Sequence, residues 1–228
     1  MRKGLALAFK TRNALGKTDA RLVLIGRVGA DLSAQGLRYS HMGFAWRGTL
    51  DGRWQIIHLL NHCGRADSDL FDEGLGNFFL DDPFAYESIV EVPSPGLQEK
   101  LLHVLASPEP DLLHTASYSM IAYPYSARYQ NSNQWVLELI AAGIANARGM
   151  SRTDAQRWLR DSGYVPSRVR ISPMQRLGAT LFRANVRFDD HIPEELASGR
   201  YQIVSVESVI DFVSRLDPAT RRFVITLD

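Results

Sequence analysis

Two apolar segments separated by a glycine- and aspartate-rich connection constrain this chain more than any other feature. Residues 39–46 and 53–60 each have the length and the aromatic and β-branched content of a β-strand. The connection at residues 48–52 reads Gly-Thr-Leu-Asp-Gly, which is typical of a tight antiparallel turn. We therefore expect a hairpin. It would bring His41 near His58, because cross-strand neighbours lie within about 5–8 Å at Cβ, although the sequence does not fix the register.

The remaining periodic segments predict an α+β protein. Helices are expected over residues 4–15, 97–106, from 131 or 132 onward, from 151 to about 163 and over 206–215; strands are expected over 21–27, 86–92, near 179–188, 201–205 and 222–227. Residues 61–83 are rich in glycine, aspartate and asparagine and predict an irregular excursion. We expect a mainly antiparallel sheet packed on the helix that starts near Ser132. Residues 1–150 would form the core, and residues 151–228 an extension that completes the same domain.

The composition of the chain argues against several classes of function. Lysine plus arginine (26) nearly balance aspartate plus glutamate (25) and the charges are interspersed, so neither nucleic acid nor an anionic membrane is an expected partner. The lone cysteine, Cys63, excludes an intramolecular disulfide and a thiolate-rich metal cage. No segment is long enough for a secretion signal or a transmembrane span. We expect a soluble chain without metal or cofactor, and the sequence leaves its oligomeric state open.

The start of the long helix supplies a candidate nucleophile. Residues 131–136 read Asn-Ser-Asn-Gln-Trp-Val and open the apolar periodicity of that helix. A helix N-terminus presents free N–H groups and the positive end of the dipole, which stabilise a developing oxyanion. Ser132 is therefore expected to attack, with His41 as general base and His58 orienting it. The alternative for Ser132 is a plain helix cap, and for each histidine alone a hydrogen-bonded core residue.

The same segments resemble the motifs of circularly permuted papain-like enzymes, a group that includes lecithin:retinol acyltransferase, phospholipase/acyltransferases and bacterial cell-wall amidases. The matching sequences are Ser40-His41-Met42-Gly43-Phe44-Ala45, Ile56-Ile57-His58-Leu59 and Asn131-Ser132-Asn133-Gln134-Trp135-Val136. The resemblance implies a papain-like core, with His41 as base, His58 as orienter and Ser132 in place of the usual cysteine. It further implies a hydrolase or acyltransferase of the cell envelope, acting on an amide or ester in a peptide, cell-wall or lipid-like substrate. The whole chain also resembles an uncharacterised bacterial domain family that reads Tyr-Gln-Asn-Ser-Asn-Gln-Trp at residues 129–135.

Serine in the place of cysteine changes the expected chemistry. A serine hydroxyl is a far weaker acid than a thiol of pKa about 8.5, so it depends on a well-oriented base. A Ser–His–His arrangement also lacks the carboxylate that stabilises the imidazolium in serine hydrolases. A catalytically inactive protein that binds a peptide, glycopeptide or lipid-like ligand in the same cleft is therefore an equal alternative, followed by a structural or partner-binding role.

Several other polar residues are candidates for a site. Those expected to contact a substrate are Tyr39, Tyr129, Asn131 and Asn133. Asp189-Asp190-His191 has metal-ligating side chains, but consecutive residues do not easily converge on one ion, so a solvated loop is expected. Cys63 has no helix start to activate it and is expected to be buried and inert.

Overall fold

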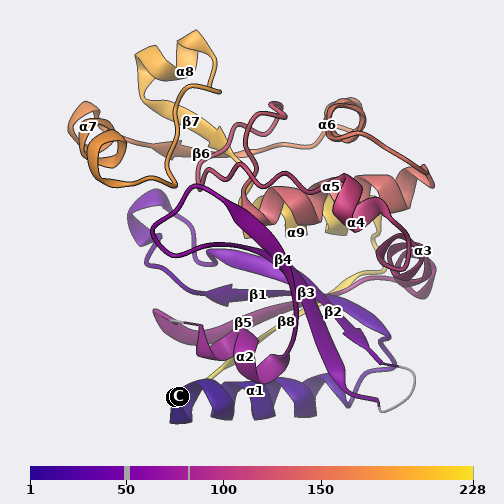
Figure 1. Cartoon of the computed structure of the whole chain (residues 1–228). Coiled ribbons are helices and arrows are strands. Elements are labelled where there is room, and N and C mark those ends of the chain that lie inside the picture. The colour runs from indigo at the N-terminus through magenta and orange to yellow at the C-terminus, as the bar shows by residue number, and fades with distance from the viewer. Residues whose placement is uncertain (49–51, 82, 228) are drawn as a thin grey trace.

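A computed structural model describes residues 1–48, 52–81 and 83–227 of the chain (Figure 1). The helices are α1 (Arg2–Leu15), α2 (Leu75–Leu80), α3 (Pro95–Leu105), α4 (Glu109–Leu112), α5 (Ser132–Ala145), α6 (Arg152–Asp161), α7 (Pro173–Phe182), α8 (Pro193–Ser198) and α9 (Val206–Leu216), with a 3-10 turn at Ser33–Gln35. The strands are β1 (Leu22–Val28), β2 (His41–Arg47), β3 (Trp54–Asn61), β4 (Ser68–Gly74), β5 (Ala85–Val92), β6 (Ser167–Arg170), β7 (Arg200–Ile203) and β8 (Arg221–Thr226). The protein is thus α+β, as expected.

A six-stranded antiparallel sheet in the order β4-β3-β2-β1-β5-β8 forms the centre of the molecule. Helices cover both of its faces: α1 and α2 lie on one side, and α5 and α9 lie on the other (Figure 1). Strand β1 is buried along its whole length, which explains why residues 22–28 read as a nearly continuous apolar run rather than an alternating one. A separate pair, β6 and β7, lies beyond the α5 side.

The predicted hairpin is confirmed. Strands β2 and β3 pair antiparallel, with Phe44 opposite Ile57 and Ala45 opposite Ile56. Residues 49–51 of the predicted turn lie outside the described residues. The long helix is also confirmed: residues 132–143 of α5 are all buried, and Asn146 ends the helix in the left-handed conformation.

Two predictions from local composition are wrong. Residues 61–83 contain β4 and α2 instead of an irregular excursion. Strand β4 is an edge strand, and its exposed Asp69 and Asp72 hide its periodicity. The strand expected near residues 179–188 is replaced by α7 and an irregular segment. The reason lies just upstream, where Ser172 and Gln175 form a capping box around Pro173 and start a helix.

The segment from residue 151 onward adds structure to both sheets. Strand β8 pairs with β5 in the central sheet, and α9 contributes Val206, Val209 and Phe212 to the core beside α5. Within the described part of the chain, every helix is too short or too polar to cross a bilayer.

Candidate active site

Ser132 is the first residue of α5 and is not its cap. The Asn131 side chain is the N-cap, because its Oδ1 accepts a hydrogen bond from the Gln134 N–H at 2.7 Å. The Ser132 hydroxyl is therefore available for another role, and its Oγ lies 3.0 Å from His41 Nδ1. Both side chains are largely buried. Because Asn131 supplies the cap, the interpretation of Ser132 as a plain helix cap is wrong.

The two histidines meet across the hairpin. His41 Nε2 lies 2.7 Å from His58 Nδ1, and the ring centroids are 5.0 Å apart. His58 is fully buried, with the rings of Phe71 and Phe78 packed around it. Space for His58 comes from Gly43, where a Cβ atom would lie only 2.8 Å from His58 Cβ. A side chain at position 43 would collide with His58, which explains why this residue is glycine.

A carboxylate that the sequence analysis missed completes the arrangement. Glu73 Oε1 lies 3.1 Å from His58 Nε2, within ion-pair distance, although the two atoms do not form a hydrogen bond. Glu73 lies on β4 directly opposite Ile56, on the same sheet face as His58 and diagonal to it. The sequence predicts an irregular excursion here and no carboxylate at the site, and both predictions are wrong: the array consists of Ser132, His41, His58 and Glu73.

One pair of histidine tautomers fits the donors and acceptors of this array. A carboxylate only accepts hydrogen bonds, so the proton of a neutral His58 belongs on Nε2 and its Nδ1 accepts. His41 must then carry its proton on Nε2, which leaves Nδ1 free to accept from the Ser132 hydroxyl. Each donor faces an acceptor, and the tautomer of His41 is the one that a general base for Ser132 requires.

The surroundings keep His41 uncharged. Burial lowers its pKa well below the usual value, and the positive charge of Arg27 adds to this. Arg27 faces His41 directly across the β1–β2 pair and forms an ion pair with Asp81. On the other side, Tyr118 lines the same cavity, and burial raises its pKa to about 12, so its hydroxyl is neutral. A neutral imidazole can take a proton from Ser132 at physiological pH.

A cavity of about 470 Å³ opens onto Ser132 and His41. Its wall also contains charged residues, Arg27, Asp31 and Asp81, and nine larger apolar side chains: Leu32, Leu37, Leu60, Met120, Ile121, Val169, Ile171, Ile203 and Val204. The backbone N–H groups of Ser132 and Asn133 belong to the first turn of α5, where the helix itself supplies no acceptor. The cavity therefore brings together a hydroxyl, an imidazole and the first N–H groups of a helix, beside an apolar part of its wall.

Of the four residues expected to contact substrate, two line the cavity and two do not. Tyr39 and Asn133 line the cavity, whereas Asn131 and Tyr129 do not. Asn133 also holds the start of β2, since its Oδ1 accepts from the Met42 N–H at 3.1 Å. The Tyr129 hydroxyl instead bonds to Asp189 at 3.2 Å. Substrate contact by Tyr39 and Asn133 stays a prediction.

Two further expectations are wrong. His191 is buried rather than solvated: its Nδ1 lies 2.7 Å from Glu195 Oε2 and its Nε2 lies 2.7 Å from the Ile121 carbonyl oxygen. Asp190 accepts from the Tyr123 N–H at 2.9 Å, so this segment fastens the loop that leads toward Ser132. Cys63 is exposed rather than buried. Among the described residues, no group of three or more His, Cys, Asp or Glu side chains is arranged to hold a metal ion.

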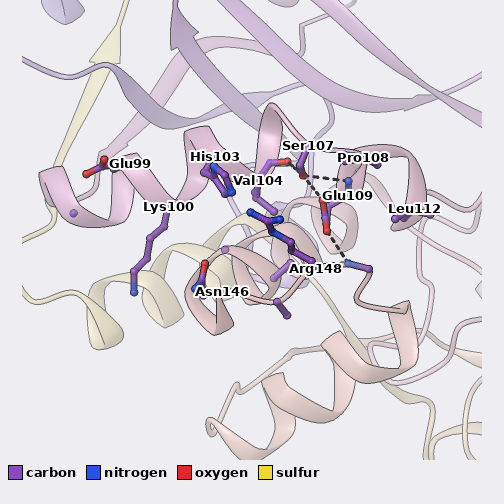
Figure 2. A pocket seen from close by; sticks show the side chains of 15 residues that line it. Glu99, Lys100, His103, Val104, Ser107, Pro108, Glu109, Leu112, Asn146 and Arg148 are labelled. Atoms are coloured by element: carbon purple, nitrogen blue, oxygen red, sulfur yellow. Dashed lines mark hydrogen bonds between the residues drawn. The ribbon is translucent and has the colours of Figure 1, made fainter.

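A larger hollow of about 810 Å³ lies elsewhere, between α3 and the C-terminal end of α5 (Figure 2). The carboxylate of Glu109 in its wall is already satisfied, because it accepts from the Gly149 N–H at 2.7 Å and from the Ser107 hydroxyl. The serine in this wall, Ser107, is hydrogen-bonded to that carboxylate and to the Val104 carbonyl oxygen, and within the described part of the chain it has no imidazole partner. We therefore place the candidate active site in the smaller cavity.

The fold and this site define an α+β protein with a serine–histidine–histidine–glutamate array at a helix N-terminus. A family model described as "Uncharacterized protein conserved in bacteria (DUF2145)" matches residues 14–213, and the chain belongs to that family. No curated protein and no solved structure matches the chain.

Proposed function

We propose that this protein is a hydrolase or acyltransferase that cleaves an ester or amide bond through Ser132. The observation that carries the proposal is the array in the wall of a cavity: the Ser132 hydroxyl is hydrogen-bonded to His41, His41 to His58, and Glu73 lies 3.1 Å from His58. The resemblance to circularly permuted papain-like enzymes supports the same roles for Ser132, His41 and His58. In those enzymes the nucleophile is a cysteine, so this chain would be a serine variant of that chemistry.

The reaction follows from the geometry. Ser132 Oγ attacks the carbonyl carbon of the substrate while its proton passes to His41 Nδ1, and the carbonyl oxygen becomes an oxyanion at the N-terminus of α5. His58 and Glu73 stabilise the imidazolium that forms on His41. When the bond to the leaving group breaks, His41 returns the proton to that group. The acyl group on Ser132 is then transferred to water or to an acceptor hydroxyl or amine by the reverse sequence of proton movements.

The cavity wall indicates which part of the substrate is recognised. Its aliphatic side chains favour an acyl or leaving group with a hydrocarbon portion, since each buried methylene contributes about 0.8 kcal/mol. Among p-nitrophenyl esters, hydrolysis should therefore become more efficient from acetate to hexanoate as the chain fills the cavity. A preference for acetate would contradict this assignment of the wall.

A serine-directed probe tests the central claim. A fluorophosphonate should label the intact protein at Ser132, and Ser132→Ala should abolish labelling while Ser119→Ala, which alters another buried serine, leaves it unchanged. A second test replaces Ser132 with cysteine. At pH 6 iodoacetamide should modify the introduced thiol at least about tenfold faster than Cys63, although Cys63 is exposed, because a neighbouring imidazole promotes the thiolate. Equal rates would contradict the proposal.

The second candidate function is ligand binding without catalysis, and Arg27 favours it. Its buried positive charge lies opposite His41 and opposes formation of the imidazolium that catalysis requires. Under this alternative neither the probe nor iodoacetamide finds a reactive group at position 132. Aliphatic esters would nevertheless raise the melting temperature of the native protein, and a bulky substitution in the cavity, Ile203→Trp, would remove that rise.

A further inference from the structure

Helix α7 presents its apolar side to solvent. Met174, Leu177 and Leu181 follow helical spacing along one side and are 83%, 61% and 65% exposed, and Phe182 beside them is 83% exposed. The opposite side holds the helix to the domain: the Arg176 guanidinium lies over the Phe188 ring and donates to the Leu196 carbonyl oxygen at 3.2 Å. The apolar side of α7 therefore has no partner among the described residues.

The surroundings of α7 carry a local excess of positive charge that the balanced total conceals. Residues 162–200 contain six arginines and four acidic residues, and two of these acidic residues are paired elsewhere, Asp189 with Arg128 and Glu195 with His191. Arg170 on β6 also lies directly opposite Arg200 on β7, a like-charge pair that is unfavourable in a strand ladder unless an anion neutralises it. Most arginines of this region form no ion pair within the described part of the chain; these are Arg168, Arg170, Arg183, Arg187 and Arg200.

A hollow of about 450 Å³ joins the two features. Arg170 and Arg176 lie in its wall together with Leu177 of the apolar side and the hydroxyl residues Ser172 and Thr180. Guanidinium and hydroxyl groups around such a space suit a phosphate-bearing head group, while the adjacent leucine suits the hydrocarbon below it.

We propose that α7 and the arginines around it form a docking surface for an anionic lipid membrane, with Leu177, Leu181 and Phe182 inserted among the acyl chains. Apolar insertion and basic residues together give stable peripheral binding where either alone is marginal. A bilayer fits better than a protein partner because α7 lies at the periphery of the molecule, and lipid accommodates a projecting helix without a matching groove (Figure 1).

Docking at α7 would place the cavity close to the lipid. Ile171, two residues before α7, and Val169 on β6 both line the cavity that contains Ser132. The membrane inference does not require Ser132 to be catalytic, because it concerns binding alone.

Vesicle co-sedimentation of the full chain tests the inference. Vesicles of phosphatidylglycerol and phosphatidylcholine in equal parts should bind the protein, and binding should weaken with added salt and be far weaker with phosphatidylcholine alone. Leu177→Ser combined with Leu181→Ser should lower the partition coefficient roughly tenfold for each leucine. Phe9→Ser, which alters a 57% exposed aromatic on α1, is the matched control and should bind like the native chain. Arg170→Gln with Arg200→Gln should cost about fivefold for each arginine on anionic vesicles.

Three results would overturn the inference. The first is a native chain that ignores anionic vesicles, and the second is a double leucine variant that binds them as well as the native chain does. The third is a native chain that forms a dimer and does not bind vesicles, and that the leucine substitutions convert to a monomer. That result would make α7 a contact between copies of the chain. Far-UV circular dichroism of each variant separates loss of binding from loss of fold.

Discussion

Replacing Gly43 by alanine should disconnect the two histidines while leaving the fold intact. The added Cβ would lie 2.8 Å from both His58 Cβ and the Ile57 carbonyl oxygen, so relief to an ordinary contact of 3.4 Å requires a shift of about 0.6 Å. Applied to His58, that shift lengthens the 2.7 Å contact with His41 to about 3.3 Å, beyond a good hydrogen bond. We expect fluorophosphonate labelling of Ser132 to slow about 10- to 100-fold, since a 1 Å misplacement costs about 100-fold.

A second glycine on the neighbouring strand provides the control. At Gly26 a Cβ would lie 2.8 Å from the Ile89 side chain and 3.1 Å from that of Val206, a comparable clash on the other face of the sheet. Both alanine variants should lose about 1–3 kcal/mol of unfolding free energy by overpacking, measured by urea denaturation. Only Gly43→Ala should slow labelling. Equal labelling of the Gly43 variant and the native chain, or equal slowing in both variants, would refute the reasoning.

Three further predictions concern charge. The labelling rate should rise with pH as His41 loses its proton, and the midpoint should lie below 6.5 because burial and Arg27 lower the pKa of His41. The Arg27→Gln substitution should move that midpoint to higher pH. A move to lower pH would contradict the role assigned to His41. Glu73→Gln should slow labelling at least about tenfold without changing the far-UV spectrum, whereas an unchanged rate would remove Glu73 from the array. Glu138→Gln leaves the buried Arg152 without its counter-charge and should lower the unfolding free energy in urea by about 3–5 kcal/mol; a loss below about 1 kcal/mol would show that the pair is dispensable.

The parts of the site on strongly periodic segments could be predicted from the sequence. The hairpin and α5 have apolar patterns long enough to identify their type, and the pairing of two strands brings His41 and His58 together without knowledge of the register. The pattern could not decide whether Asn131 or Ser132 caps the helix, because both residue types serve as caps. Only the hydrogen bond to Gln134 settles that point.

Glu73 could not be predicted because its strand has one polar side. Edge strand β4 alternates only weakly, and its aspartates and glycine resemble a loop. One signal for this strand was available in the sequence: Gly64, a few residues after His58. In the structure Gly64 has the left-handed conformation and lies in the turn of a second hairpin, in which β4 pairs with β3. The role of Arg27 could not be predicted for a related reason, since a charged residue next to an apolar run is typical of the end of a strand.

The burial of His58 has a consequence for where a proton can travel. His58 has no exposed surface, and His41 lines the cavity. In the proposed reaction, a bound molecule that fills the cavity would leave a hydrogen ion taken from Ser132 two routes: to the departing fragment, or through His58 to the partly exposed Glu73. Solvent isotope exchange at the imidazole nitrogens should accordingly be slow in the empty protein and slower still in the occupied one.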